Sequence, residues 1–260
     1  MQSLLPSLTA TWHNGSYPSI SSSRSELSVA SKTIIIKGGG SGIGRATVVS
    51  FSRAGASNII LIGRTKSSLE DTQKLLSCDG SICVADITDE KRMAEVAASG
   101  GDLGCTYSRC SIHFLPWFRP GYISHATVIG YTAAITFPAA MLPGLSAYAI
   151  SKLAITKLME YIAAEDPSIC TGALHPGMEE TELIKASGTD PAAVPLDSVE
   201  LAGDFAVWLT SKEASFLNGR YVRANWDVDE VKAKAGEIQP QSAVDDEYPG
   251  MALWFSLVCV

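Results

Sequence analysis

The sequence lacks the excess of positive charge that proteins use to bind nucleic acids. Its 20 Lys and Arg residues are outnumbered by 27 Asp and Glu residues, which gives a formal net charge of −7, and no basic run interrupts this balance. An acidic chain is repelled by the phosphates of nucleic acids and of anionic membranes. We therefore expect neither as a partner.

Targeting and membrane-spanning patterns are also missing. The first thirty residues have no basic start and no continuous apolar stretch, so no secretory signal is predicted. The apolar run at 251–260 is far too short to span a bilayer. These absences predict a cytoplasmic protein.

None of the six cysteines forms a CxxC pair. Cys105 and Cys110 lie near His113, but a fourth ligand and the usual spacing of a metal site are missing. We predict no metal, and free thiols in a reducing compartment.

What the chain does contain is a regular alternation of strand and helix patterns. Strands are predicted at 33–37, 58–62, 81–84, 127–131, 170–174 and 220–224. Helices are predicted at 45–54, 66–76, 147–164 and 199–209, with Leu69, Leu75 and Leu76 of the second and Leu153, Leu158, Met159 and Ile162 of the third facing inward. This order is typical of an α/β fold with a Rossmann-type, doubly wound parallel sheet.

The domain organisation follows from the same pattern. We predict a single Rossmann-type domain at 32–238, preceded by an arm at 1–31 and followed by a tail at 239–260. The first thirty residues are rich in serine and also contain Trp12 and Tyr17, so an ordered arm and a disordered tail are both open.

One part of the sheet is too short for this fold. Only 51 residues separate the start of the strand at 81–84 from the end of the strand at 127–131. Two crossovers that share a middle strand need roughly 55 to 60 residues, because one βαβ unit takes about 30. The irregular segment 100–122 offers only 111–115 as a middle strand. The central crossover is therefore predicted to be shortened.

A glycine-rich turn follows the first strand and opens directly into a helix. Gly38, Gly42 and Gly44 allow a tight turn and the close approach of a pyrophosphate to the helix N-terminus. After the second strand, Arg64 stands where an NAD site would carry an acid, and Arg45 follows the glycine turn. A charge-assisted grip on a 2′-phosphate by these arginines favours NADP over NAD, the alternative being that both are surface arginines.

Tyr148 and Lys152 are four residues apart within a predicted helix, so they share one face. An ammonium beside a phenol favours the phenolate and should lower the tyrosine pKa from about 10. Such a tyrosine can give a proton to, or take one from, a carbonyl or alcohol oxygen.

These motifs together resemble the short-chain dehydrogenase/reductase family of the classical type, and most of all its fungal members of secondary-metabolite pathways. The similarity extends from about residue 11 to 238, with a break at about 101–124. The matching pieces are GGGSGIG at 38–44, ADITD at 85–89, PGLSAYAISK at 143–152, HPG at 175–177 and NWDVDE at 225–230.

The resemblance implies a role for each matching position. Tyr148 is the general acid/base, and Lys152 lowers its pKa and binds the nicotinamide ribose. Asp86 and Ile87 line the adenine pocket, although a strand-end cap is an alternative for Asp86. Pro176, Gly177 and Thr181 border the nicotinamide and the pyrophosphate. The cofactor-binding set is Gly38, Ser41, Gly42, Ile43, Gly44, Arg45, Arg64, Asp86, Ile87, Tyr148, Lys152, Pro176, Gly177 and Thr181.

Three departures from the family pattern stand out. Lys37 replaces the threonine expected before the first glycine. The serine expected to polarise a substrate carbonyl is absent, and Thr132, or less directly Thr136, offers the nearest hydroxyl. The Asn-Ala-Gly segment of the fourth strand and the helix asparagine of the proton relay have no counterpart, since no asparagine lies between Asn58 and Asn218. Either the gene model has lost a segment or the protein is a degraded member.

The sequence therefore predicts an NADP-dependent oxidoreductase that interconverts an alcohol and a carbonyl on a small molecule, with Tyr148, Lys152 and Thr132 as its catalytic residues. The alternative is a non-catalytic or degraded dinucleotide-binding protein that has kept the Rossmann half. The resemblance implies a homodimer or homotetramer.

Overall fold

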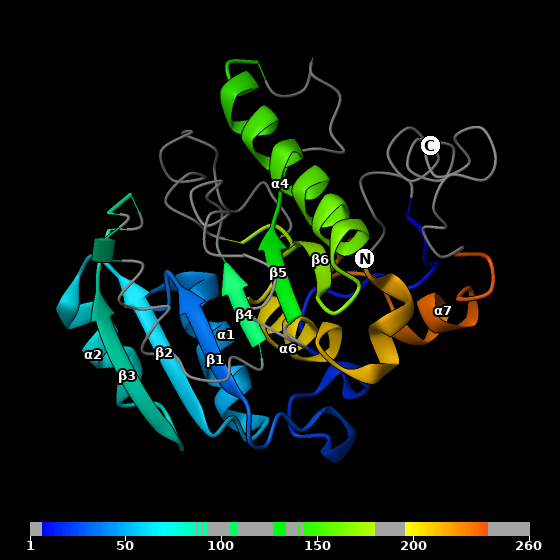
Figure 1. Ribbon diagram of the computed structural model, residues 1–260. Helices are drawn as coiled ribbons and strands as arrows, with labels where there is room; N and C mark the ends of the chain where they lie inside the picture. Colours follow the sequence, from blue (N-terminus) through cyan, green and yellow to red (C-terminus); the bar gives the residue numbers. More distant parts are fainter. Residues whose placement is uncertain are drawn as a thin grey trace.

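The computed structural model describes residues 7–86, 88–89, 91–92, 105–108, 127–133, 140, 143–179 and 196–238, with the backbone alone at 105–108. Seven strands of this described part form one parallel sheet in the order β3-β2-β1-β4-β5-β6-β7 (Figure 1). The strands are β1 (Thr33–Lys37), β2 (Asn58–Gly63), β3 (Asp79–Val84), β4 (Cys105–Ser108), β5 (Thr127–Tyr131), β6 (Cys170–His175) and β7 (Arg220–Arg223). The doubly wound Rossmann-type sheet is confirmed.

Helices cover both faces of this sheet. They are α1 (Gly42–Arg53), α2 (Lys66–Gln73), α4 (Ser146–Glu165), α6 (Val199–Leu209) and α7 (Val228–Ala233), with 3-10 turns η1 (Pro18–Ile20), η2 (Ser25–Leu27) and η6 (Lys212–Leu217). In Figure 1, α1 and α6 lie behind the sheet and α4 lies in front of it. Because β1 and β2 are covered on both faces, their sequences TIIIK and NIILIG are almost continuously apolar.

The middle strand is the clearest correction to the sequence prediction. β4 occupies Cys105–Ser108 and pairs with β1 and β5, so the middle strand does not fall at 111–115, which lies outside the described residues. The run CTYS is only four residues long and has no alternating pattern, so it carries little strand signal. A middle strand exists, in a place that the sequence did not indicate.

The prediction that Leu75 and Leu153 face inward was also wrong. α2 ends at Gln73 rather than at 76, and Leu75, in the tight turns that follow, is 55% exposed. On α4 the buried face runs through Ile155, Met159 and Ile162. Leu153 lies two residues before this row, which is more than half a turn around the helix, and it is 43% exposed.

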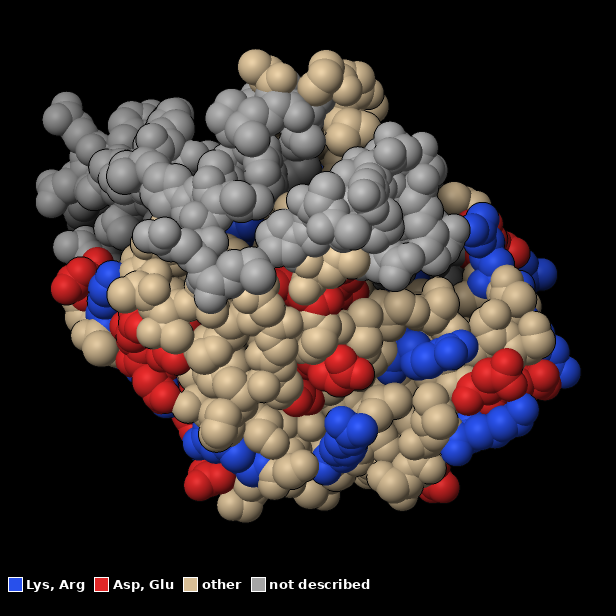
Figure 2. Space-filling view, turned by 180° about the vertical axis from the view of Figure 1, so that it is seen from behind, with Lys and Arg blue, Asp and Glu red and all other residues tan. Residues whose placement is uncertain are grey.

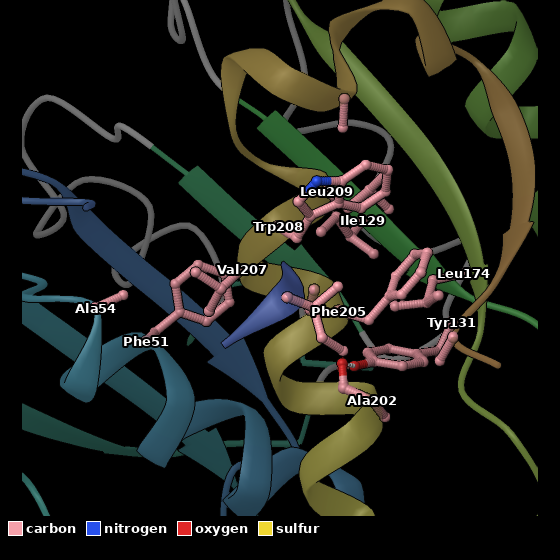
Figure 3. Close-up of a cluster of buried hydrophobic side chains, with 14 of the residues drawn as sticks. Phe51, Ala54, Ile129, Tyr131, Leu174, Ala202, Phe205, Val207, Trp208 and Leu209 are labelled. Atoms are coloured by element: carbon pink, nitrogen blue, oxygen red, sulfur yellow. Dashed lines mark hydrogen bonds between the residues drawn. The ribbon is translucent and has the colours of Figure 1, made fainter. Parts of the chain in front are cut away.

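The main core lies between the sheet and the helices α1 and α6 (Figure 3). The rings of Phe205 and Trp208 meet edge to face at 5.1 Å. The two helices approach closely at Gly203, where a Cβ would lie 2.9 Å from the carbonyl oxygen of Ala46. Only glycine fits this crossing without displacing a helix.

The described part of the arm, residues 7–31, lies against the domain. Ile20 and Leu27 are fully buried and belong to the main core, and Trp12 forms an antiparallel bridge with Trp226. Of the two options left open by the sequence, the ordered arm is the one observed for these residues. The division at 31 and 238 stays a prediction, and the tail 239–260 lies outside the described residues.

Charge is mixed over the face seen in Figure 2. Acidic and basic side chains are interspersed over the described part of this face, with no continuous patch of one sign. Within the described part of the chain, no helix is both long and apolar enough to span a membrane.

Candidate functional site

The described residues of the predicted site lie at the C-terminal edge of the sheet. The chain runs outward from β1 to β3, then returns to β4 and continues to β7, so the direction reverses between β1 and β4. In doubly wound sheets ligands bind in the crevice at such a reversal. The glycine turn lies at one side of this point and the start of α4 at the other (Figure 1).

The glycine turn has the geometry of a phosphate cradle. Gly38 and Gly42 have φ of +75° and +49°, a region that favours glycine. A Cβ on Gly44 would lie 2.0 Å from the carbonyl oxygen of Gly38, so no side chain fits there. Ser41 is the N-cap residue of α1, in extended conformation and without a side-chain capping hydrogen bond, and Ile43 is buried. The predicted residues 38–44 thus form one turn that presents the N-terminus of a twelve-residue helix, which fits a pyrophosphate.

Arg45 braces this turn. Its Nη2 donates to the carbonyl oxygen of Gly40 at 2.6 Å, and its Nε donates to Thr72 Oγ1 of α2 at 3.0 Å. Two of its five donors are therefore engaged within the protein. Arg64, in contrast, is exposed directly after β2. Of the two arginines, Arg64 is the more accessible to a 2′-phosphate.

Asp86 follows β3 and behaves as a turn residue. One of its carboxylate oxygens accepts from the backbone N–H of Thr88 at 2.9 Å and from its hydroxyl at 2.8 Å. These two hydrogen bonds, and then the charges of Arg64 and Lys37, lower the pKa of Asp86. The strand-end capping that the sequence left open is therefore observed. The neighbouring Ile87 lies outside the described residues.

Tyr148 and Lys152 lie in the first two turns of α4, which begins beyond the ends of the central strands (Figure 1). The Lys152 ammonium is 5.3 Å from the centre of the Tyr148 ring. Both side chains are half-buried, so they can be reached from solvent. The predicted proximity of these two residues is observed.

Thr132 follows β5, as predicted, and its hydroxyl has partners within the protein. It is buried at the end of β5, where its hydroxyl donates to the carbonyl oxygen of Lys152 at 3.1 Å and accepts from Thr156 Oγ1 at 3.1 Å. A hydroxyl has one proton, so orienting a substrate oxygen would require Thr132 to leave Lys152. In this arrangement Thr132 joins β5 to α4. Thr136 lies outside the described residues.

The turn after β6 completes the edge. His175 and Pro176 are buried, and the backbone N–H of Gly177 donates to His175 Nδ1 at 3.1 Å. Burial, and then the charges of Arg223 and Lys152, lower the pKa of His175 to about 3, so the ring is neutral at ordinary pH. Thr181 lies outside the described residues.

Sequence reasoning missed Asp197 and Asn14. The carboxylate of Asp197 holds the backbone of Met178, the residue after Gly177, and accepts from the side chain of Asn14 in the arm. A single aspartate and a single asparagine, 183 residues apart, give no pattern that could have identified them.

The arrangement brings together a cradle for a dinucleotide and a phenol–ammonium pair that can exchange a proton with an oxygen. Within the described residues, no group of three His, Cys, Asp or Glu side chains is placed to hold a metal ion.

Comparisons with a family model and with known sequences all point to the same family. A family model for short chain dehydrogenases matches residues 32–100. A short chain dehydrogenase/reductase of Claviceps purpurea is 30% identical over 267 residues, which cover 88% of this chain and 89% of that protein. A short chain dehydrogenase of Monascus purpureus is 28% identical over 283 residues, which cover 90% of this chain and 94% of that protein. This alignment is longer than the 260 residues of the chain, so that relative carries residues with no counterpart here.

Solved structures share the fold. The Pseudomonas aeruginosa RhlG/NADP active-site complex superposes with a TM-score of 0.65 at 19% identity, covering 78% of this chain and 98% of that one. A 7α-hydroxysteroid dehydrogenase complexed with NADH and 7-oxo glycochenodeoxycholic acid has the same TM-score and identity, covering 80% and 96%. One neighbour thus carries NADP and the other NADH.

Proposed function

Because this chain belongs to the short-chain dehydrogenase/reductase family and is an oxidoreductase of that family, we propose that it interconverts an alcohol and a carbonyl on a small molecule with NADP as cofactor. The observation that carries this proposal is the pair formed by Tyr148 and Lys152, with the Lys152 ammonium 5.3 Å from the centre of the Tyr148 ring. Similarity to fungal relatives supports a role in secondary metabolism, and we place the activity in the cytoplasm.

Each residue would have a defined task. When bound, a reduced nicotinamide supplies hydride to a carbonyl carbon. Tyr148 would donate its proton to the carbonyl oxygen, and the Lys152 ammonium would stabilise the phenolate that remains. The N–H groups of the glycine turn would hold the pyrophosphate at the N-terminus of α1. Thr132 would orient the substrate oxygen if its hydroxyl turns away from Lys152.

The preference for NADP is supported by Arg64. The adenosine ribose of a bound dinucleotide would lie beyond the end of β2. At the position where an NAD site carries an Asp or Glu, this chain has the exposed Arg64. A guanidinium can bind a 2′-phosphate in a bidentate, charge-assisted manner. Neighbouring structures carry either cofactor, so the arginine is the main support for this choice.

A second candidate is a dinucleotide-binding protein without catalysis. Two observations favour it: the Thr132 hydroxyl is bound to the Lys152 carbonyl oxygen, and the chain has no asparagine between Asn58 and Asn218 for a proton relay. Such a protein would still bind the cofactor, so binding and turnover must be measured separately.

The experiment combines calorimetry with turnover. Wild-type protein is titrated with NADPH and with NADH, then assayed with NADPH against a panel of ketones and aldehydes. Tyr148→Phe removes the proton donor and should abolish turnover, while the affinity for NADPH stays within about twofold.

Tyr161→Phe is the matched control. Tyr161 lies on the same helix with the Lys157 ammonium 5.6 Å from its ring centre, yet it is 56% exposed and more than three helical turns from Tyr148. This variant should keep full activity. Normal turnover by Tyr148→Phe would refute the mechanism, and NADPH binding without turnover of any substrate would favour the second candidate.

A further inference from the structure

The N-terminal arm is connected to the turn after β6 through one carboxylate. Asp197 Oδ1 accepts from Asn14 Nδ2 at 2.6 Å, and its Oδ2 accepts from the backbone N–H of Met178 at 2.6 Å. The backbone of Asp197 also donates to the carbonyl oxygen of Met178 at 2.7 Å. A single side chain therefore joins two segments that are far apart in the sequence.

On the arm side, the partner of Asp197 is held firmly. The carbonyl oxygen of Asn14 accepts from Ser198 at 2.8 Å. The preceding residue, His13, exchanges two hydrogen bonds with the fully buried Asn225, one from its N–H at 2.9 Å and one to its carbonyl oxygen at 2.8 Å. Asn14 thus has little freedom, and its amide is fixed toward Asp197.

On the other side, the carboxylate packs directly against the turn. Gly177 has φ of +109°, and a Cβ there would lie 2.6 Å from Asp197 Oδ2. The N–H of Gly177 is already bound to His175 Nδ1. The conformation of residues 175–178 therefore depends on the position of the Asp197 carboxylate.

This turn lies at the C-terminal end of β6, on the side of the sheet where Thr132 and Lys152 lie. β6 is three strands from β1, which is about 14 Å at the usual strand spacing. The end of β6 is joined to Thr132 by the hydrogen bond from Thr132 N to the carbonyl oxygen of Leu174, at 2.9 Å. Thr132 in turn contacts Lys152. Arg64 and Asp86 lie at the opposite end, beyond β2 and β3.

We propose that Asp197 is a positioning residue that sets the turn 175–178 against the nicotinamide half of the bound cofactor, and that Asn14 of the N-terminal arm holds Asp197 in place. This inference rests on the proposed dinucleotide-binding function. The arm would then act on the cofactor site indirectly, through the hydrogen bond from Asn14 to Asp197.

The test uses the full chain and two probes in calorimetry. NADPH spans both halves of the site, whereas adenosine 2′,5′-bisphosphate occupies the adenosine half alone. Asp197→Asn keeps the size of the side chain but replaces one acceptor by a donor. It should raise the Kd for NADPH about tenfold, because hydrogen bonds to a charged group are lost, and leave the Kd for the bisphosphate unchanged. Asn14→Ala should act in the same direction, by about threefold.

Asp229→Asn and Ser19→Ala are matched controls. Asp229 accepts from Ser19 of the same arm at 2.5 Å, but neither residue contacts the turn through this bond. Both control variants should bind the two probes as the wild type does.

The outcomes separate the two proposals. Weaker binding of NADPH alone, in Asp197→Asn and Asn14→Ala only, supports the positioning role. An equal loss of affinity for both probes, or a loss of affinity in the control variants as well, would indicate general destabilisation and would overturn the positioning role. An unchanged Kd for NADPH in Asp197→Asn would also overturn it. Wild-type protein that binds neither probe would refute the proposed function, and this inference with it.

Discussion

His175 lies fully buried between β5 and β7, and its ring accepts a hydrogen bond from Gly177 rather than carrying a charge. With a pKa near 3 in the folded protein and about 6.5 in an unfolded chain, it binds a proton only on unfolding across that range. The folded state should therefore lose stability as pH falls below 6.5.

In the variant His175→Asn the new side chain does not titrate, but its amide oxygen can still accept the hydrogen bond from Gly177. Between pH 7.5 and 5.5 the wild type should lose about 1.4 kcal/mol of unfolding free energy more than the variant does. Urea denaturation at both pH values measures this difference. Parallel losses in the two proteins would show that folding does not change the pKa of His175.

The site shows which residues a sequence can reveal. Tyr148, Lys152 and the glycines of the turn were predicted because each motif is continuous in sequence and its spacing sets its geometry. The role of Thr132 in orienting a substrate oxygen stays a prediction, and its hydroxyl donates to the carbonyl oxygen of Lys152 in the structure. Asp197 gave no signal, because its partners come from separate segments that only the folded chain brings together.

Among the elements, the glycine turn and the start of α1 keep their conformation only if residue 44 has no side chain. In Gly44→Ala the new methyl group would collide with the backbone oxygen of Gly38, so the turn must open. We expect a loss of about 1–3 kcal/mol in unfolding free energy, as for other overpacked sites. The Kd for NADPH should rise at least tenfold, because the N–H groups of the turn are displaced. Thermal unfolding and calorimetry measure both.

Gly42→Ala is the comparison for this prediction. A Cβ at Gly42 meets nothing within 4 Å, so only the positive φ of +49° opposes it. The expected cost is about 1 kcal/mol. A Gly44→Ala protein as stable as wild type, with unchanged affinity, would show that the turn tolerates a side chain.

The sequence was most informative for elements covered on both faces. β1 and β5 were predicted with their observed bounds, because a buried parallel strand is an apolar run between turn signals. β4 was misplaced, since four residues are too few to show a period. The arm was left undecided because its order comes from contacts with α7 and with the segment after β7, which no local pattern records.

For the whole molecule, α4 exposes three large apolar side chains on its outer side, where Lys157 also lies. Ile150, Leu153 and Tyr161 are 66%, 43% and 56% exposed, and their spacing of three and then eight residues keeps them near one side of the helix. Apolar groups gathered on one helix face favour association. We predict a homo-oligomer that buries this face.

The double variant Ile150→Asp, Leu153→Asp should be monomeric by light scattering where the wild type is a dimer or tetramer. Leu75→Asp changes a leucine of similar exposure after α2 and should leave the mass unchanged. A wild type that is monomeric at all concentrations would contradict the prediction.

The arm also has a consequence for how the chain folds. His13 pairs with Asp227, 214 residues later, and the backbone of residues 10 and 11 binds Glu230. The arm therefore closes one of the longest loops that the chain can form, and such contacts are formed slowly. During synthesis α6 and α7, which pack against η1, are made long after the arm, so Ile20 of η1 stays in a solvent-exposed segment until they have been made. A chaperone that shields the first thirty residues should raise the yield of folded protein more than one that acts on the sheet.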